Sequence, residues 1–407
     1  MEHPLVDDVE ELGFDAFCEG LPLDDLDRLR GNKPVFRTTL ADGTTAWNLV
    51  RYDDIATVLA ASRHYSVAPV VVDLDQSAES DGSTERWELR AAMALNAPTH
   101  GLHKQRLASA VKRDRVEAFR TVVRDIATRF ARSCKQKRRA DAVEDFAAPL
   151  AAEIACSYLG IAPANRDYVR RLSANFMGDS LPDVAIGSHR DLELGACALN
   201  AVCGSPMRAT TELVYESWRK VPWLAPEFVA HAGRWEIEEL ALQTITAGVA
   251  GLRNCIVTAI VCVAAQWEIA KSDTSTWLSR QSKVADEVIR HATPLLRVRR
   301  ILATDAVWHG TTIRAGETLF AWLLGANFDP DTFSDPRGFQ PFRTPNPHLS
   351  FTGGAHACLG APLARMEVEE VIRAMLLEWT GLTLDAPPVR FTSNIVNEYV
   401  HLPIRVS

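Results

Sequence analysis

The sequence predicts a mainly α-helical protein with small β-sheets, and three observations lead to this fold class. Apolar side chains recur with helical spacing on one face of Arg115–Ala131. The segment Arg234–Lys271 is compatible with helix over an unusual length. Pro34–Thr39 and Thr44–Val50 are rich in β-forming residues and flank Asp42-Gly43, which is typical of a β-hairpin.

The remaining elements fit the same fold class. Asp145–Leu159 is predicted to be a helix with a proline in its first turn, and Pro362–Leu377 is predicted to be another. Val298–Ile301 and Asp305–His309 carry short β signals. About 28 residues, Asn327–Gly354, lack periodicity but contain many Pro, Gly, Asn and Phe residues. A loop of this length is usually functional or disordered, and its aromatic content favours an ordered loop.

Composition and charge exclude several classes of protein. The 407 residues include 44 Lys and Arg against 52 Asp and Glu, a formal net charge of −8, which disfavours nucleic-acid binding. The acidic N-terminal segment does not resemble a secretory signal. The most apolar stretch, Ile245–Trp267, is interrupted by Arg253 and Asn254, so we expect a buried helix rather than a membrane span. The eight cysteines form no CxxC pair, which is typical of reduced thiols in a cytoplasmic protein.

Cys358 lies among residues that suit a metal ligand. Gly353 and Gly354 precede it and Gly360 follows, which permits close backbone approach to a large, flat group. A helix is predicted to begin near Pro362, and its free N–H groups would stabilise a thiolate. Because no second Cys or His has zinc spacing, a single axial thiolate to haem iron fits best. An inert core thiol is the alternative.

Phe351, Gly354, Cys358 and Gly360 match the pattern FxxGxxxCxG, and this stretch resembles the haem-binding loop of the cytochrome P-450 superfamily. Thr352 stands where bacterial members usually have Gly. The resemblance implies the cytochrome P-450 fold, haem b (iron protoporphyrin IX) as the cofactor and Cys358 as the iron ligand. It runs from about residue 34 to the C-terminus in family order, so we expect residues 1–407 to form a single cytochrome P-450 domain.

The resemblance also implies which side chains contact the haem propionates. His356 matches the loop residue that reaches a propionate, and Arg300 matches the propionate-binding arginine, with Arg297 as a rival. His100 and Lys104 match the family segment DPPEHxxxR, with Lys in place of Arg; a solvated helix start is the alternative. The implied haem-binding residues are His100, Lys104, Arg297, Arg300, Phe351, Gly354, His356, Cys358 and Gly360.

A second motif of the family precedes the loop. Glu287 and Arg290 form an ExxR, whose i, i+3 spacing places both charges on one helix face. In the family a further arginine joins this pair from the irregular segment before the haem loop. That arginine would fall on Gly338, and Arg337 is one position away, so the third member of the network is not assigned by the sequence.

The long helix departs from the family pattern A-G-x-(D/E)-T. Ala247 and Gly248 match, but Ala250 and Gly251 stand at the positions of the acid and the alcohol. In family monooxygenases that pair organises water and delivers protons, and neither residue here has a side chain that relays one. Arg253 is expected on another helix face, although it is a candidate for reaching the pocket. The catalytic positions implied by the resemblance are Cys358, Ala250 and Gly251.

Three functions follow from the resemblance. The first is a haem-thiolate oxidoreductase of bacterial secondary metabolism that catalyses an atypical oxidation, oxidative coupling or hydroxylation, of a small organic substrate with O2. The second is a peroxide-dependent or redox-neutral enzyme, in which an arginine and a substrate carboxylate replace the relay. The third is a non-enzymatic haem-binding protein. The retained haem-binding motifs favour the first function.

Family position also predicts the partners and the pocket. Electrons would come from a ferredoxin and its reductase, which would meet Arg365 on the Cys358 side, and we expect neither nucleic-acid nor membrane partners. The segments 66–95 and 180–230 would cap the pocket. Its apolar lining, for which a core position is the alternative, would include Ala247, Ala250, Leu295, Leu296, Ile395 and Val396.

Overall fold

A computed structural model describes residues 12, 14–39, 43–61, 64–67, 96, 99–167, 240–241 and 243–407. The predicted cap segments, 66–95 and 180–230, therefore lie almost entirely outside the described residues. The helices are η1 (Phe14–Phe17), α1 (Leu23–Asn32), α2 (Tyr52–Ala60), α3 (Thr99–Ala108), α4 (Arg113–Lys137), η3 (Ala142–Ala147), α5 (Ala148–Tyr158), η4 (Thr244–Gly248), α11 (Val249–Ala265), α12 (Trp267–Ser272), α13 (Thr274–Ser279), α14 (Gln281–Ala292), α15 (Leu323–Asn327), η5 (Gly354–His356) and α16 (Ala361–Glu378).

The strands form small sheets, as the sequence predicts. They are β1 (Val35–Thr39), β2 (Thr45–Leu49), β3 (Tyr65–Ser66), β4 (Arg139–Asp141), β5 (Val298–Leu302), β6 (Ala306–Trp308), β7 (Thr311–Ile313), β8 (Thr318–Ala321), β9 (Leu382–Leu384), β10 (Val389–Phe391), β11 (Glu398–His401) and β12 (Pro403–Val406). The five-stranded sheet has the order β1-β2-β8-β5-β3, and in it only β2 and β8 pair in parallel. The predicted hairpin is confirmed as β1 and β2, with Gly43 at φ +80° in its turn.

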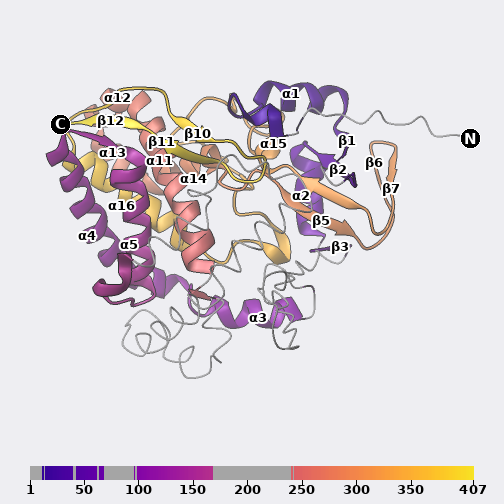
Figure 1. The fold of residues 1–407 in the computed structure, drawn as a ribbon, viewed down its shortest axis with the longest axis horizontal. Helices are drawn as coiled ribbons and strands as arrows, with labels where there is room; N and C mark the ends of the chain where they lie inside the picture. The colour runs from indigo at the N-terminus through magenta and orange to yellow at the C-terminus, as the bar shows by residue number, and fades with distance from the viewer. Residues whose placement is uncertain are drawn as a thin grey trace, which may run out of the picture.

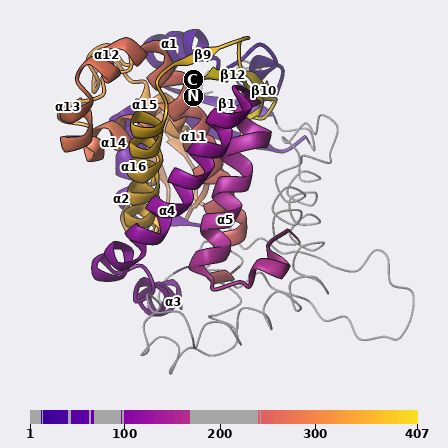
Figure 2. The ribbon, with the colours of Figure 1, turned by 90° about the vertical axis from the view of Figure 1, so that its left-hand side faces the viewer.

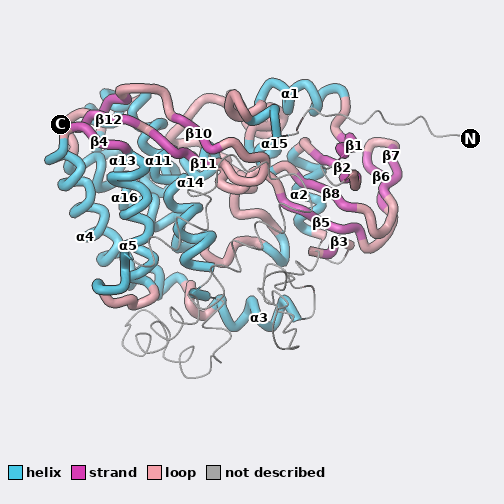
Figure 3. Tube along the Cα trace, viewed as in Figure 1, coloured by secondary structure: helices cyan, strands magenta, loops and turns pink. Residues whose placement is uncertain are grey.

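Helices and sheet occupy different sides of the described structure. Helices α4, α5, α11, α14 and α16 gather at the end that carries the C-terminus, whereas the five-stranded sheet lies with α1 and α2 at the other end (Figures 1 and 3). Figure 2 shows α4 running alongside α16 and α5. The largest hydrophobic cluster lies between these helices, and the buried side chains of α4 include Val116, Phe119 and Val123. The helical spacing in the sequence therefore identified a core face correctly.

The long helical segment is interrupted, which corrects the prediction of one continuous helix. Gln266 leaves the helical conformation (φ −123°, ψ 22°), and its side chain donates to the carbonyl of Phe339. At the other end, η4 is a turn of π-helix that leads directly into α11. Thr244–Ala265 is apolar and long enough to cross a membrane by composition, but 67% of its most apolar window is buried inside the protein, as expected for a core helix.

Candidate haem-thiolate site

Cys358 lies between η5 and α16, where the chain turns into a helix. Its backbone N–H donates to the carbonyl of Phe351 at 2.9 Å. Surrounding protein atoms partly desolvate the sulfur and raise the pKa of its thiol, whereas the N–H groups of Gly360 and Ala361 and the nearby cation of Lys104 oppose that rise. Cys358 is exposed in this loop, whereas the cysteines of α4, α5 and α11 (Cys134, Cys156, Cys255 and Cys262) are buried. The loop thus presents one thiol for chemistry.

The backbone of this loop is held tightly. Gly354 has φ +63°, and a Cβ placed there would lie 2.0 Å from the carbonyl oxygen of Leu59 in α2. The close approach that requires this glycine is therefore to α2. Thr352, at a position where the family pattern usually has Gly, also has positive φ (57°), a rare conformation for a β-branched residue. Its hydroxyl donates to the carbonyl of His356 at 2.9 Å.

Four basic side chains from three segments converge beside the loop. The ring centroids of His100 and His356 lie 4.0 Å apart. Lys104 Nζ donates to the carbonyls of Ala355 at 2.5 Å and Ala357 at 2.6 Å. Burial lowers the pKa of His356 to about 4, and the charges of His100, Arg300 and Lys104 lower it further.

This basic group has no carboxylate partner among the described residues. Arg300 is only 7% exposed, and its guanidinium donates only to the backbone carbonyl of Arg299. Burial lowers the pKa of Arg300, because desolvation disfavours its charge. Two cations and two imidazole rings packed together without an acid fit an anionic ligand, because the imidazoles also offer N–H donors. The residues present therefore fit a haem, with Cys358 toward the iron and His100, Lys104, Arg300 and His356 toward the propionates.

Arg297, the rival of Arg300, has other neighbours. Its guanidinium lies 4.0 Å from the ring centroid of Phe320 and 5.2 Å from that of Trp322, and it donates to Asn394 Oδ1 at 3.1 Å. Phe320 belongs to β8 and Trp322 directly follows that strand. The geometry therefore favours Arg300 over Arg297 for an anionic ligand at the loop.

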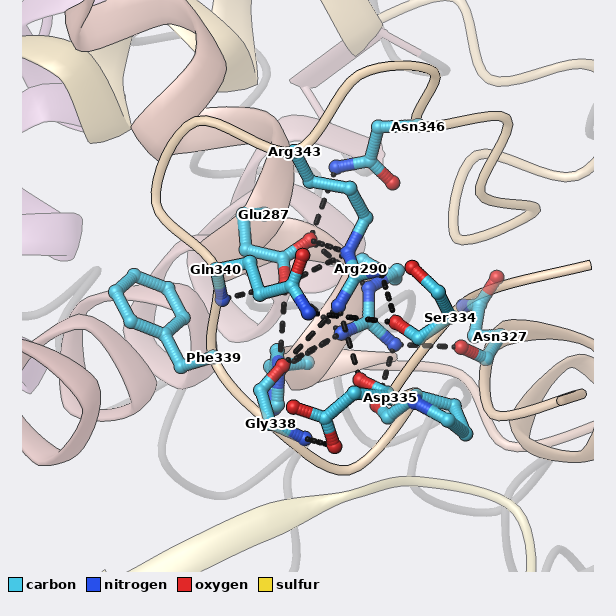
Figure 4. A network of polar contacts seen from close by, with 12 residues as sticks. Glu287, Arg290, Asn327, Ser334, Asp335, Gly338, Phe339, Gln340, Arg343 and Asn346 are labelled. Atoms are coloured by element: carbon cyan, nitrogen blue, oxygen red, sulfur yellow. Dashed lines mark hydrogen bonds and ion pairs between the residues drawn. The ribbon is translucent and has the colours of Figure 1, made fainter.

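The ExxR pair is the centre of a buried polar network (Figure 4). Arg290 donates twice to the Glu287 carboxylate, at 2.9 Å each, and both side chains are fully buried. Although burial raises the pKa of Glu287, hydrogen bonds from Arg290 and His291 hold it far below its usual range. The backbone N–H of Gln340 and the side chain of Asn346 also donate to this carboxylate.

The third member of the network is Arg343, which the sequence reasoning missed. Arg343 Nε lies 3.0 Å from both carboxylate oxygens of Glu287, and its other nitrogens donate to backbone carbonyls such as that of Ser334. A Cβ on Gly338 would lie 1.9 Å from Asp335 Oδ2, so a larger residue there would have to displace the carboxylate of Asp335. Arg337 instead pairs with Asp24 and Asp27 of α1. Arg337 and Arg343 are the only arginines in 327–354, and the sequence spacing, which left the third member unassigned, pointed to the neighbourhood of Arg337 and not to Arg343.

Comparisons with known proteins agree with this geometry. The family described as Cytochrome P450 matches residues 281–396. The structure of P450BioI in complex with an acyl carrier protein superposes with a TM-score of 0.80 over 95% of this chain and 99% of that one, at 21% identity. The bacillaene polyketide synthase P450 PksS of Bacillus subtilis gives a TM-score of 0.78 over both full chains, at 22% identity. The chain is a cytochrome P450, a monooxygenase-like oxidoreductase.

Its relatives by sequence are bacterial monooxygenases. It is 29% identical to a methyl-branched lipid omega-hydroxylase of Mycobacterium tuberculosis, over 89% of this chain and 84% of the relative. It is 28% identical to the 20-oxo-5-O-mycaminosyltylactone 23-monooxygenase of Streptomyces fradiae, over 93% and 87%. The names of these two relatives give substrates of different classes. The comparison therefore does not identify the substrate of this cytochrome P450.

At the start of α11, small apolar residues stand at the two positions that the sequence resemblance assigns to an acid and an alcohol. Ala247 and Gly248 are exposed, Ala250 is buried and Gly251 is half-buried. A Cβ on Gly251 would meet no atom within 4 Å. Arg253 is buried, and it donates to the carbonyl of Tyr399 in β11. Its guanidinium is thus engaged with the C-terminal hairpin, as expected for another face of the helix.

The predicted pocket residues outside this helix come together in space. Leu295 forms a β-bridge with Val396, and the N–H of Leu296 donates to the carbonyl of Ile395 at 2.7 Å. Leu295, Ile395 and Val396 are half-buried. The side chain of Leu296 is fully buried in the cluster that includes Phe36. The structure thus places Leu296 in the core, whereas Leu295, Ile395 and Val396 keep some exposed surface.

Arg365, predicted to meet an electron donor, has an internal partner. Its Nε lies 2.6 Å from Asp286 Oδ1, and its guanidinium lies over the ring of Phe351, 4.7 Å from the centroid. The side chain remains 40% exposed. Arg365 thus connects α16, α14 and the Cys358 loop.

Proposed function

We propose that this protein is a haem-thiolate enzyme of bacterial secondary metabolism that oxidises a small organic substrate with O2 and electrons from a ferredoxin. The proposed reaction is an atypical oxidation, either oxidative coupling or hydroxylation. The observation that carries the proposal is the pairing of Cys358, at the start of α16, with four basic side chains that have no described acid partner.

Cys358 and the basic residues beside its loop each have a defined task in this proposal. The thiolate of Cys358 would hold haem b and would accept hydrogen bonds from the N–H groups of Gly360 and Ala361. When bound, a thiolate-ligated haem supplies the activation of dioxygen. Lys104 and Arg300 would neutralise the propionates, and the imidazoles of His100 and His356 would donate hydrogen bonds to them. Arg297, which the sequence offered as an alternative, would instead hold the side chain of Asn394 in place through a hydrogen bond.

The proposed pocket is apolar and contains few fixed charges. Ala247 and Ala250 on the distal helix and the Leu295–Val396 bridge would orient the substrate and exclude water. The absence of an acid and an alcohol at 250 and 251 is the reason for proposing an atypical oxidation, because proton delivery must then come from a water or a substrate group.

The peroxide-dependent alternative receives less support. It needs an arginine beside the substrate to hold a carboxylate, and Arg253 is the candidate on this helix. Arg253 donates instead to the carbonyl of Tyr399. Turnover with hydrogen peroxide alone, without ferredoxin, its reductase and NAD(P)H, would favour that alternative over our proposal.

A carbon monoxide difference spectrum tests the central claim. Reduced, CO-bound protein is expected to show the red-shifted Soret band of a thiolate-ligated haem. Cys358→Ala is expected to abolish that band, whereas Cys262→Ala, which removes a buried thiol from α11, is expected to retain it. A wild-type protein that folds without the band, or a Cys358→Ala variant that keeps it, would contradict the proposal. A screen for substrate-induced spin shifts over peptides, aromatics and terpenoids would then define the substrate class.

A further inference from the structure

Asn254 is a buried polar residue one helical turn beyond the missing acid and alcohol. It is 2% exposed and lies on α11 four residues after Ala250 and three after Gly251. Residues at these spacings share a helix face. Helical side chains also point toward the N-terminus and cover the preceding turn. The side chain of Asn254 is therefore directed toward the turn that contains Ala250 and Gly251.

The amide of Asn254 is only half satisfied. Its Oδ1 accepts a hydrogen bond from Thr258 Oγ1 at 3.2 Å, whereas its Nδ2 is buried without a partner. Exchanging the amide oxygen and nitrogen would leave the other end unpaired instead. Buried amides normally have partners at both ends, and an unpaired end is a ready site for an ordered water.

There is room for such a water at the same turn. A Cβ on Gly251 would meet nothing within 4 Å, and Ala247 and Gly248 are exposed. No acidic or hydroxyl side chain occupies positions 247 to 256. Asn254 Nδ2 is thus a buried donor without a partner, three residues from the open space beside Gly251.

We propose that the Asn254 amide orders a water molecule beside Gly251 and so replaces the missing acid and alcohol side chains in organising proton delivery. This inference rests on the proposed haem-thiolate function. Asn254 is a positioning residue: the amide is neutral and holds the water, and the protons come from solvent. Thr258 fixes the amide by occupying its other end.

The infrared C–O stretch of the reduced, CO-bound protein tests the proposal, because it responds to hydrogen bonding near the ligand. Asn254→Leu removes the amide at similar volume and is expected to shift the stretch to higher wavenumber. The matched control is Cys255→Ala, which alters the next buried residue of α11 and leaves the amide in place. A stretch at the wild-type position in Asn254→Leu would overturn the proposal.

A rescue experiment separates positioning from a structural role. With a surrogate ferredoxin and its reductase, Asn254→Leu is expected to release a larger share of the consumed dioxygen as hydrogen peroxide than Cys255→Ala does. Adding Gly251→Thr, for which the structure has space, is expected to reverse that rise. A structural role for Asn254 predicts no such reversal, and an unreversed rise would count against the proposal.

Two further outcomes keep the test decisive. If Asn254→Leu fails to incorporate haem, Asn254→Asp, which replaces only the amino group by oxygen, must move the same C–O stretch; an unmoved stretch overturns the inference. If wild-type protein shows no thiolate-type CO spectrum, both the proposed function and this inference are wrong. A normal spectrum with an unmoved stretch rejects this inference alone.

Discussion

The loop that carries Cys358 and the helix α11 differ sharply in how polar contacts hold them. The loop rests on the ExxR network, where a single carboxylate, that of Glu287, accepts hydrogen bonds from Arg290, Arg343, Gln340 and Asn346. Where η4 leads into α11, residues 247–251 are only Ala, Gly and Val. The first region is fixed by many mutually dependent contacts, whereas the second has space for substitution.

The largest effect is expected from removing Arg343. Arg343→Ala leaves the buried carboxylate of Glu287 without one of its two arginines, which is expected to cost about 3–5 kcal/mol in the free energy of unfolding. Arg337→Ala, the matched control, removes a partly exposed pair with Asp24 and Asp27 and is expected to cost at most about 1 kcal/mol. Urea unfolding and haem content measure both. Equal losses would mean that Arg343 is not the third member of the network.

Replacing one glycine in each region by alanine is expected to change stability in opposite directions. In Gly354→Ala the new Cβ would lie 2.0 Å from the Leu59 carbonyl oxygen at positive φ, which is expected to destabilise the loop by roughly 2–4 kcal/mol. In Gly251→Ala the Cβ enters open space in a helix, and the protein is expected to gain about 0.5–1 kcal/mol. Thermal unfolding of the two variants tests this, and a larger loss at Gly251 would reverse the proposed contrast.

A pH-dependent effect is expected from Glu367, which is buried in α16 at 7% exposure. Burial raises its pKa to about 8 from 4.5. Between these values the folded state keeps the proton that the unfolded state releases, so this group lowers stability as pH rises from 4.5 to 8. The loss is about 5 kcal/mol above pH 8 and absent below pH 4.5.

Glu367→Gln isolates that contribution. Relative to wild type, the variant is expected to become more stable as pH rises across this interval, because glutamine never ionises. Glu369→Gln, two residues away in α16 and paired with Arg120, is the control, since removing its charge breaks an ion pair. A stability difference between Glu367→Gln and wild type that stays constant from pH 5 to pH 8 would show that Glu367 is ionised when buried.

The smallest effect is expected at Thr352. Thr352→Gly relieves a positive φ of 57° but removes the hydrogen bond to the carbonyl of His356. These changes oppose each other, and the net change in the free energy of unfolding is expected to stay within about 1 kcal/mol. Thermal unfolding with haem bound measures it. A loss of several kcal/mol would mean that the hydroxyl, more than the backbone conformation, holds the loop.

The sequence predicted the fold class, the hairpin, the core face of α4 and the thiol loop, because each is a local pattern. Helical spacing, an Asp-Gly turn and a cysteine between glycines are readable without knowing what lies across the molecule. The ExxR pair belongs to the same class, since three residues along a helix bring Glu287 and Arg290 together.

Only the tertiary structure decided between residues that look equivalent in the chain. It selected Arg343 over Arg337 for Glu287, turned Leu296 into the core, and left the amide of Asn254 half paired. Each outcome depends on which distant segment packs against the residue: the irregular chain after α15, the sheet beside α1, or the open turn of α11. Sequence spacing fixes neighbours along one element, but burial and partners across elements depend on how the whole chain closes around its core.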